Sequence, residues 1–160
     1  MYNHKLSTLI LLCLAFFATS CGGGSSEKSE SETVAEAPKA PMTLEEAEKG
    51  WETNNGVGPV KSLELPAEID QALADAGKVI YEAKCTACHK IEKRFIGPSP
   101  KGIMERRTAA WVMNMILDPE GMVKEDPIAR QLLIKFSAPM ANQSLTEDDA
   151  RAVVEYFRTL

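Results

Sequence analysis

Five consecutive residues of this chain, Cys85-Thr86-Ala87-Cys88-His89, have the types and the spacing that can do cofactor chemistry. C-x-x-C-H is the attachment signal of a c-type haem. The two thiols lie three residues apart on one helical turn, so each can reach one vinyl group of the same porphyrin. His89 follows at once and is placed to offer an imidazole nitrogen to the iron. The motif therefore predicts one covalent haem c, attached through Cys85 and Cys88, with His89 as an axial ligand.

Two other uses of these residues are less well supported. A structural zinc site needs about four ligands, and outside the motif the only other His and Cys residues are His4, Cys13 and Cys21, all close to the N-terminus. A thioredoxin-like dithiol requires a surrounding βαβ pattern. No part of this sequence has the alternating apolar and polar residues of a strand, so covalent haem attachment is the favoured interpretation.

The N-terminus has the layout of a secretory signal. A short basic start at His4 and Lys5 is followed by nine apolar residues, 9–17, and then by small residues. A helix that spans a bilayer needs roughly 20 apolar residues, so this run is too short to be one. We therefore predict a signal peptide of the lipoprotein type over residues 1–20.

Cys21 follows a cleavage region, Ala18-Thr19-Ser20, that is similar to a bacterial lipobox, although Ala18 stands where Leu is usual. Ordinary cleavage after Ser20 also fits these small residues, but it would leave a lone reactive thiol at the mature N-terminus. We expect Cys21 to carry lipid, which anchors the protein on the periplasmic side of a bacterial membrane. Because Cys13 is lost with the signal, no disulfide is expected.

Composition divides the rest of the chain into three parts. Residues 21–41 are rich in Gly, Ser, Glu, Ala and Pro, which predicts a flexible, lipid-anchored tether. Residues 42–68 form an extension with one short helix, which begins at a capping box of Thr43 and Glu46. Residues 69–160 are long enough for one small core, particularly around a buried porphyrin.

The pattern of residues 69–160 is helical with interruptions, so we expect an all-α domain. The apolar face of a first helix that runs into the haem motif is predicted from residues at helical spacing: Ile69, Leu73, Ala76, Ile80 and Ala83. Three further helices are expected: from Thr108 to before Asp118-Pro119, from Asp126-Pro127 to about Phe136, and from the capping pair Thr146 and Asp149 onward.

From Gly77 to Leu160 the sequence resembles class I cytochromes c, the small monohaem electron carriers. The residues that carry this resemblance are Gly77 and Tyr81 before the motif, Gly97-Pro98 after it, Met140 behind Pro139, and Tyr156-Phe157 near the end of the chain. The resemblance implies a class I cytochrome c fold around one haem. It also implies that the first and last helices cross closely, with Gly77 facing the aromatic pair.

The same resemblance implies the remaining groups around the iron. Met140 follows a helix-breaking Pro just before the last helix, as the axial Met does in the family, and is the expected sixth ligand. The carbonyl of Pro98 is expected to accept a hydrogen bond from the ring of His89. No second His remains in the mature chain to compete. Met113 and Met115 are expected to be core packing, and Met42, Met104 and Met122 lie outside the expected helices.

Two filled axial positions leave no open site on the iron, so we expect a carrier of single electrons and not an enzyme. The expected donor is a quinol-oxidising complex, and the expected acceptor is a terminal reductase or oxidase. Residues 56–60 and 111–119 look like those of cytochromes that accompany nitrous oxide reductase in Bacteroidetes-type bacteria. The alternatives are a haem-based gas sensor or peroxidase, which needs an open sixth position, and a structural lipoprotein of a redox complex.

Charge indicates how a redox partner could dock. The chain has a net charge of −5, which becomes −6 when Lys5 is removed with the signal. Residues 84–107 nevertheless carry a net +5, from Lys84, Lys90, Lys93, Arg94, Lys101, Arg106 and Arg107 against Glu92 and Glu105. A positive collar around the haem edge would steer an acidic partner, whereas a solvated face without a partner is the alternative. Nucleic acid is not expected to bind an exported, net acidic protein.

Overall fold

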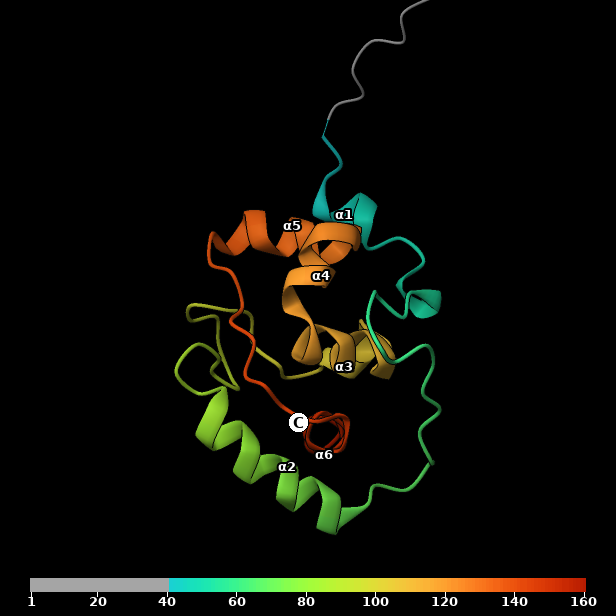
Figure 1. Cartoon of the computed structure of the whole chain (residues 1–160), viewed down its shortest axis with the longest axis vertical. Coiled ribbons are helices and arrows are strands. Elements are labelled where there is room, and N and C mark those ends of the chain that lie inside the picture. The colour runs from blue at the N-terminus through green and yellow to red at the C-terminus, as the bar shows by residue number, and fades with distance from the viewer. Residues whose placement is uncertain (1–40) are drawn as a thin grey trace, which may run out of the picture. The chain divides into compact units, whose positions relative to one another are not determined.

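The structure, a computed structural model, describes residues 41–160 (Figure 1). The expected signal peptide, the lipidated Cys21 and the tether as far as residue 40 lie outside the described residues. The helices are α1 (Leu44–Ala47), α2 (Gln71–Lys84), α3 (Ala109–Leu117), α4 (Pro119–Glu125), α5 (Pro127–Phe136) and α6 (Glu147–Phe157), with short 3-10 turns at Trp51–Thr53 and Ile103–Glu105. No residue from 41 to 160 is in a strand, which confirms the all-α prediction. None of these helices is long and apolar enough to cross a membrane.

Side-chain caps set most of the helix starts, as the sequence predicted. Thr108 caps α3, Asp126 caps α5, and Thr146 forms a capping box with Asp149 at the start of α6. Each cap supplies an acceptor for a backbone N–H that has no partner inside its own helix. The predicted bounds of α3 and α5 and the predicted start of α6 are therefore confirmed.

Helix α4 was not predicted. Asp118-Pro119 ends α3, but the same pair also starts a new helix, because the Asp118 side chain accepts a hydrogen bond from the N–H of Gly121 and Pro119 takes the first helical position. Met122, which was expected in a loop, consequently lies in α4 and is fully buried.

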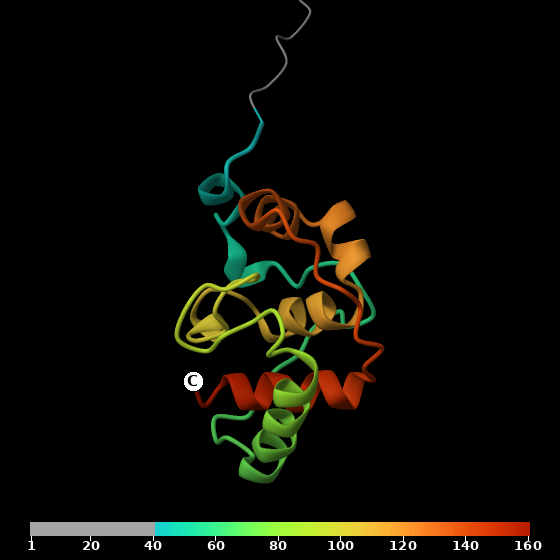
Figure 2. The ribbon, with the colours of Figure 1, turned by 90° about the vertical axis from the view of Figure 1, so that its left-hand side faces the viewer.

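The helices pack in a chain of neighbours, in the order α2, α6, α3, α4, α5 and α1. Figures 1 and 2 show α2 crossing α6 at one end, α3 in the middle, and α1, α4 and α5 at the other end. The crossing is close because Gly77 of α2 lies against the backbone of α6. A Cβ at position 77 would overlap with the carbonyl oxygen of Ala152, so a side chain is excluded there.

This close crossing corrects the predicted face of α2. The buried residues are Ala74, Gly77 and Tyr81, whereas Ala76 and Ala83 of the predicted face are exposed. Small residues allow the backbones of α2 and α6 to approach each other. The face of α2 that is buried is therefore the one with Ala74 and Gly77, not the one with the larger apolar side chains. The aromatic pair Tyr156 and Phe157 packs on Tyr81, with ring centroids 5.6 and 5.8 Å away, whereas Gly77 faces the backbone of Ala152 and Val153.

A buried carboxylate fastens the start of α2 to α6. Glu155 of α6 is 1% exposed and accepts hydrogen bonds from the N–H of Asp70 at 2.8 Å, from Arg151 at 2.5 Å and from Arg158 at 2.6 Å. Burial alone raises the pKa of this carboxyl, but the three donors outweigh it and lower the pKa below its usual value. Glu155 therefore stays ionised and paired at neutral pH.

The extension before α2 is held by two buried polar side chains. Asp126 accepts hydrogen bonds from the Asn54 amide at 2.7 Å and from the Trp111 ring at 3.1 Å. Asn114, which is fully buried, donates to the carbonyls of Asn55 and Val60 and accepts from the N–H of Val60. The extension thus belongs to the same compact unit as the helices.

We expect Gly77→Ala to destabilise the protein by about 1–3 kcal/mol, because the added methyl group must displace the backbone of Ala152. Denaturant unfolding of the two proteins measures this difference. Helix propensity alone would change the free energy of unfolding in the opposite direction, by about 1 kcal/mol in favour of Ala. A stabilised variant would therefore show that the crossing is not tight.

Candidate functional site

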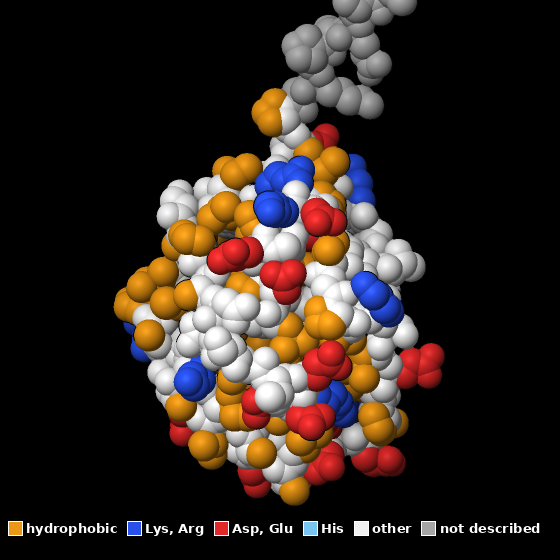
Figure 3. Space-filling model, viewed as in Figure 1, with side chains coloured by type: hydrophobic (Ala, Val, Ile, Leu, Met, Phe, Trp, Pro, Cys, Tyr) orange, Lys and Arg blue, Asp and Glu red, His pale blue; other side chains and the backbone are white. Residues whose placement is uncertain are grey.

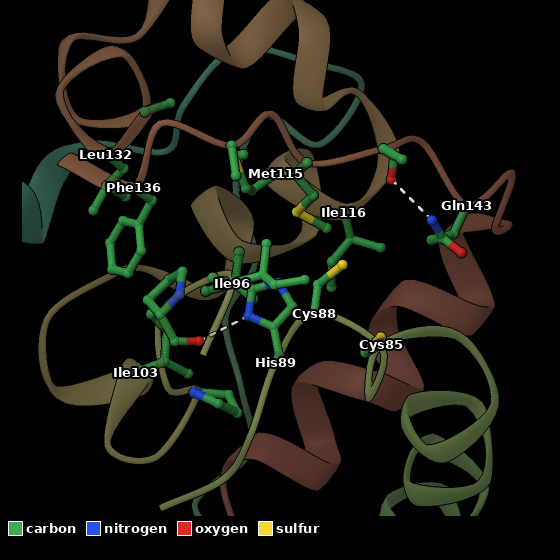
Figure 4. Close-up of a pocket in the computed structure, with 18 of the residues that line it drawn as sticks. Cys85, Cys88, His89, Ile96, Ile103, Met115, Ile116, Leu132, Phe136 and Gln143 are labelled. Atoms are coloured by element: carbon green, nitrogen blue, oxygen red, sulfur yellow. Dashed lines mark hydrogen bonds between the residues drawn. The ribbon is translucent and has the colours of Figure 1, made fainter. Parts of the chain in front are cut away.

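One cavity collects all the residues that the sequence placed around the cofactor. Cys85, Cys88, His89, Pro98 and Met140 line it together, although they come from the end of α2, the following loop and the segment before α6. Its other walls are largely apolar and include Ile103, Val112, Ile116, Leu132, Phe136 and Phe157. The empty space is about 1230 Å³, counted with the solvent at the open mouth. Figure 4 shows Cys88 and His89 near Ile116, with Leu132 and Phe136 on the other side of the view.

The two thiols reach the cavity because the chain turns just after α2. Cys85 is the last cap residue of α2, and its carbonyl accepts hydrogen bonds from the N–H groups of Cys88 at 3.1 Å and His89 at 2.9 Å. Burial raises the pKa of the Cys85 thiol to about 11, and the neighbouring Cys88 thiol adds to the shift. A catalytic dithiol instead needs a lowered pKa, so the thioredoxin-like alternative is disfavoured.

The ring of His89 is fixed by its hydrogen bond. Its Nδ1 lies 2.7 Å from the carbonyl oxygen of Pro98, and because a carbonyl can only accept, Nδ1 must carry the proton. In the neutral ring Nε2 then keeps a lone pair for a metal. Figure 4 shows the ring within the cavity, with this hydrogen bond directed away toward the loop.

Two neighbours leave the histidine little freedom. A Cβ on Gly97 would lie 2.5 Å from Cε1 of the His89 ring, so a glycine is required for the ring to approach the loop. The hydroxyl of Tyr81 donates to the carbonyl of His89 at 3.0 Å. Burial is the largest of the causes that raise the pKa of Tyr81 to about 12, so this hydroxyl remains a donor at neutral pH.

The groups present fit a haem better than a bare metal ion. Two thiols, one imidazole and the thioether of Met140 share a cavity with apolar walls, which is the donor set of a covalently attached haem with axial His and Met. Within residues 41–160, no three His, Cys, Asp or Glu side chains gather as ligands of an ion.

Met115 also lines the cavity, where the sequence predicted only core packing. Figure 4 shows it beside Ile116, on the α3 wall of the cavity. Trp111, Val112, Met115 and Ile116 all line the cavity, and their spacing is that of one helix face. That spacing was the signal in the sequence from which the position of Met115 at the cavity could have been predicted. Met113, on another face, is buried as expected.

Fewer cations are free to form the predicted positive collar than the seven in the sequence of residues 84–107. Arg107 is 3% exposed and pairs with Glu48, and Lys101 pairs with Glu92 at 2.8 Å. Arg106 turns inward and donates to the carbonyls of Ser99 and Lys101. Five of the seven cations of the predicted collar form no ion pair within the described residues: Lys84, Lys90, Lys93, Arg94 and Arg106.

Comparison with known proteins gives matches for this part of the chain. The family described as Cytochrome c matches residues 74–160. A solved cytochrome c from Rhodothermus marinus is 40% identical, with a TM-score of 0.62, over 64% of this chain and 88% of that one. An engineered form of the Rhodothermus protein is 39% identical, with a TM-score of 0.62, over 64% of this chain and 89% of that one.

A shorter match is to a cytochrome c-553-like protein of Synechocystis sp. (strain ATCC 27184 / PCC 6803 / Kazusa). It is 36% identical over 45 residues, which are 28% of this chain. The match spans 43% of the Synechocystis protein's length.

Proposed function

The chain belongs to the cytochrome c family, and on that basis we propose that Cys85 and Cys88 attach its haem while His89 and Met140 are the axial ligands. The protein is an electron-carrying haem protein of the class I cytochrome c fold with one covalent haem c. When bound, haem supplies a one-electron couple between Fe(II) and Fe(III). The observation that carries the proposal is that both thiols, the oriented ring of His89 and Met140 line one cavity.

The residues around the cavity determine the reduction potential of that one-electron couple and whether the iron has an open position. A thioether ligand favours Fe(II) and raises the reduction potential relative to a second imidazole. The apolar walls limit the access of water, which also tunes the potential. With Met140 in place both axial positions are taken, and we propose a carrier instead of an enzyme, a gas sensor or a peroxidase.

We further propose that the carrier works at a membrane, through a lipid on Cys21. A quinol-oxidising complex is its proposed donor, and a terminal oxidase or reductase is its proposed acceptor. The sequences of residues 56–60 and 111–119 support the narrower proposal that the acceptor is nitrous oxide reductase.

The remaining cations suggest where a partner docks. Lys90 lies 5.1 Å from the ring centroid of Phe95, and Arg94 lies 4.6 Å from that of Phe136. Phe95 and Ile96 are about half exposed, so an apolar patch with cations beside it continues the cavity wall. Figure 3 shows hydrophobic side chains gathered at the left edge, with Lys and Arg close by. We propose that an acidic redox partner docks on this surface.

The axial ligand carries the functional claim, and Met140→Ala tests it in exported, haem-loaded protein. If the Met140 sulfur binds iron, the oxidised wild type has the weak far-red band of sulfur-to-iron(III) charge transfer. The variant should lose this band, bind carbon monoxide when reduced, and have a lower reduction potential. Mass spectrometry after denaturation should show haem still attached in both proteins.

Met115→Leu is the matched control, because it removes the other thioether that lines the cavity. The far-red band should persist in this variant. Loss of the band in Met115→Leu, with retention in Met140→Ala, would move the ligand to Met115. A wild type that binds carbon monoxide rapidly would instead favour the sensor or peroxidase.

Lys93→Glu tests the docking surface, with oxidation by the hexacyanoferrate(III) anion as the probe. The rate should fall by about 3- to 10-fold at 10 mM ionic strength and recover near 1 M, where the Debye length is about 3 Å. Lys78→Glu makes the same change of charge on an exposed residue of α2 that does not line the cavity. Equal effects of the two variants, measured by stopped flow, would show that only net charge matters.

Cys21→Ser tests the anchor. The variant should move from the membrane fraction to the soluble periplasmic fraction, because the lipid is attached to this thiol alone. Fractionation followed by haem staining measures the distribution. A variant that stays with membranes after a salt wash must have another anchor.

A further inference from the structure

The segment between α5 and α6, which carries Met140, has few restraints of its own. Within the described chain, no residue from 138 to 145 makes a backbone–backbone hydrogen bond. Its ends are fixed, by the cap residue Ser137 of α5 and by the capping box at Thr146. Between these ends, Met140 and Leu145 pack partly against the core. The path of the segment therefore depends on side-chain contacts.

Asn142 supplies the contact that ties this segment to another helix. Its amide Nδ2 donates to the carbonyl of Leu117, the last residue of α3, at 3.0 Å, and its Oδ1 accepts from the N–H of Ser144 at 2.7 Å. Gln143 donates to Ala141 at 3.1 Å and so remains within the segment. Among the described hydrogen bonds of residues 138–145, only the Asn142–Leu117 bond leaves the segment.

Helix α3 is a firm support for such a bond. Seven of its nine residues are buried. Its buried Asn114 makes hydrogen bonds to the backbone of Asn55 and Val60 in the extension. Leu117 ends the helix, where carbonyls have no N–H donor from their own helix and are open to outside donors. Met115, two residues earlier, lines the cavity. The Leu117 carbonyl therefore has a fixed place relative to the cavity wall.

We propose that Asn142 is a positioning residue that keeps Met140 at the cavity through its hydrogen bond to Leu117. This inference rests on the proposed ligation of iron by Met140. Without the bond, the segment between its two fixed ends is free to open away from α3 more often. An external ligand can bind only while the segment is open, so its apparent affinity measures the open fraction.

Asn142→Asp tests this role with little change of shape. The carboxylate retains an acceptor for the N–H of Ser144 but has no donor for Leu117. Asn55→Asp is the matched control, because Asn55 also donates from Nδ2 to a backbone carbonyl, that of Lys61 at 2.8 Å. Asn55 does not line the cavity. Both variants add the same charge, so only the position differs.

Imidazole is the external ligand, titrated into oxidised, haem-loaded protein. Asn142→Asp should bind it about 2- to 10-fold more tightly than the wild type, which is the effect of one hydrogen bond, whereas Asn55→Asp should match the wild type. Thermal unfolding of both variants reports any general loss of stability. If Asn142 has a role in structure alone, Asn142→Asp should have a lower melting temperature but bind imidazole as the wild type does, which would overturn the proposal.

The outcomes separate this inference from the proposed function. If the wild type has the far-red band but Asn142→Asp and Asn55→Asp bind imidazole equally, Asn142 does not position Met140, and the axial ligand stands. If the wild type lacks the band and binds carbon monoxide rapidly, ligation by Met140 fails and the inference fails with it.

Discussion

The contact of Gly77 with the backbone of Ala152 determines where α2 ends, and the haem motif begins at that end. The two backbones touch at Gly77, and Glu155 of α6 holds the start of α2 through the N–H of Asp70. One turn beyond Gly77, Tyr81 packs on the aromatic rings of α6 and donates to the carbonyl of His89. The packing of α2 on α6 thus also orients His89 in the site.

Helix α3 has the corresponding role on another wall. It contributes Met115 to the cavity, receives the extension through Asn114, and ends at the carbonyl that binds Asn142. The buried amide of Asn114 would be costly if it were unpaired. Its bonds and the exposed bond of Asn142 each join α3 to a segment distant in sequence. The two walls are therefore positioned by different interactions. Helix α2 is placed by the close backbone contact of Gly77 with α6, and the segments around α3 are placed by hydrogen bonds.

Local signals in the sequence predicted the helix bounds well, because a cap such as Asp126 with Pro127 acts within four residues. They failed where the deciding contact is distant. The buried face of α2 depends on α6, and the loss of Arg107 from the collar depends on Glu48 in the extension. Met115 was missed for a related reason, since a methionine on a helix looks the same whether it faces a core or a cavity. Helix α4 was missed because one Asp-Pro pair serves two helices.

The link between Asp126 and Asn54 has a consequence for how the protein is divided. The family match begins at residue 74, yet the buried carboxylate of Asp126 and the amide of Asn114 find partners before it, at residues 54–60. A fragment cut at the family boundary would keep both haem cysteines but remove all the partners of the Asn114 amide that lie in residues 54–60 and one donor to Asp126, which keeps Trp111. Each group left unsatisfied in the interior would cost about 1–3 kcal/mol. The segment that matches the family is therefore shorter than the compact unit to which it belongs.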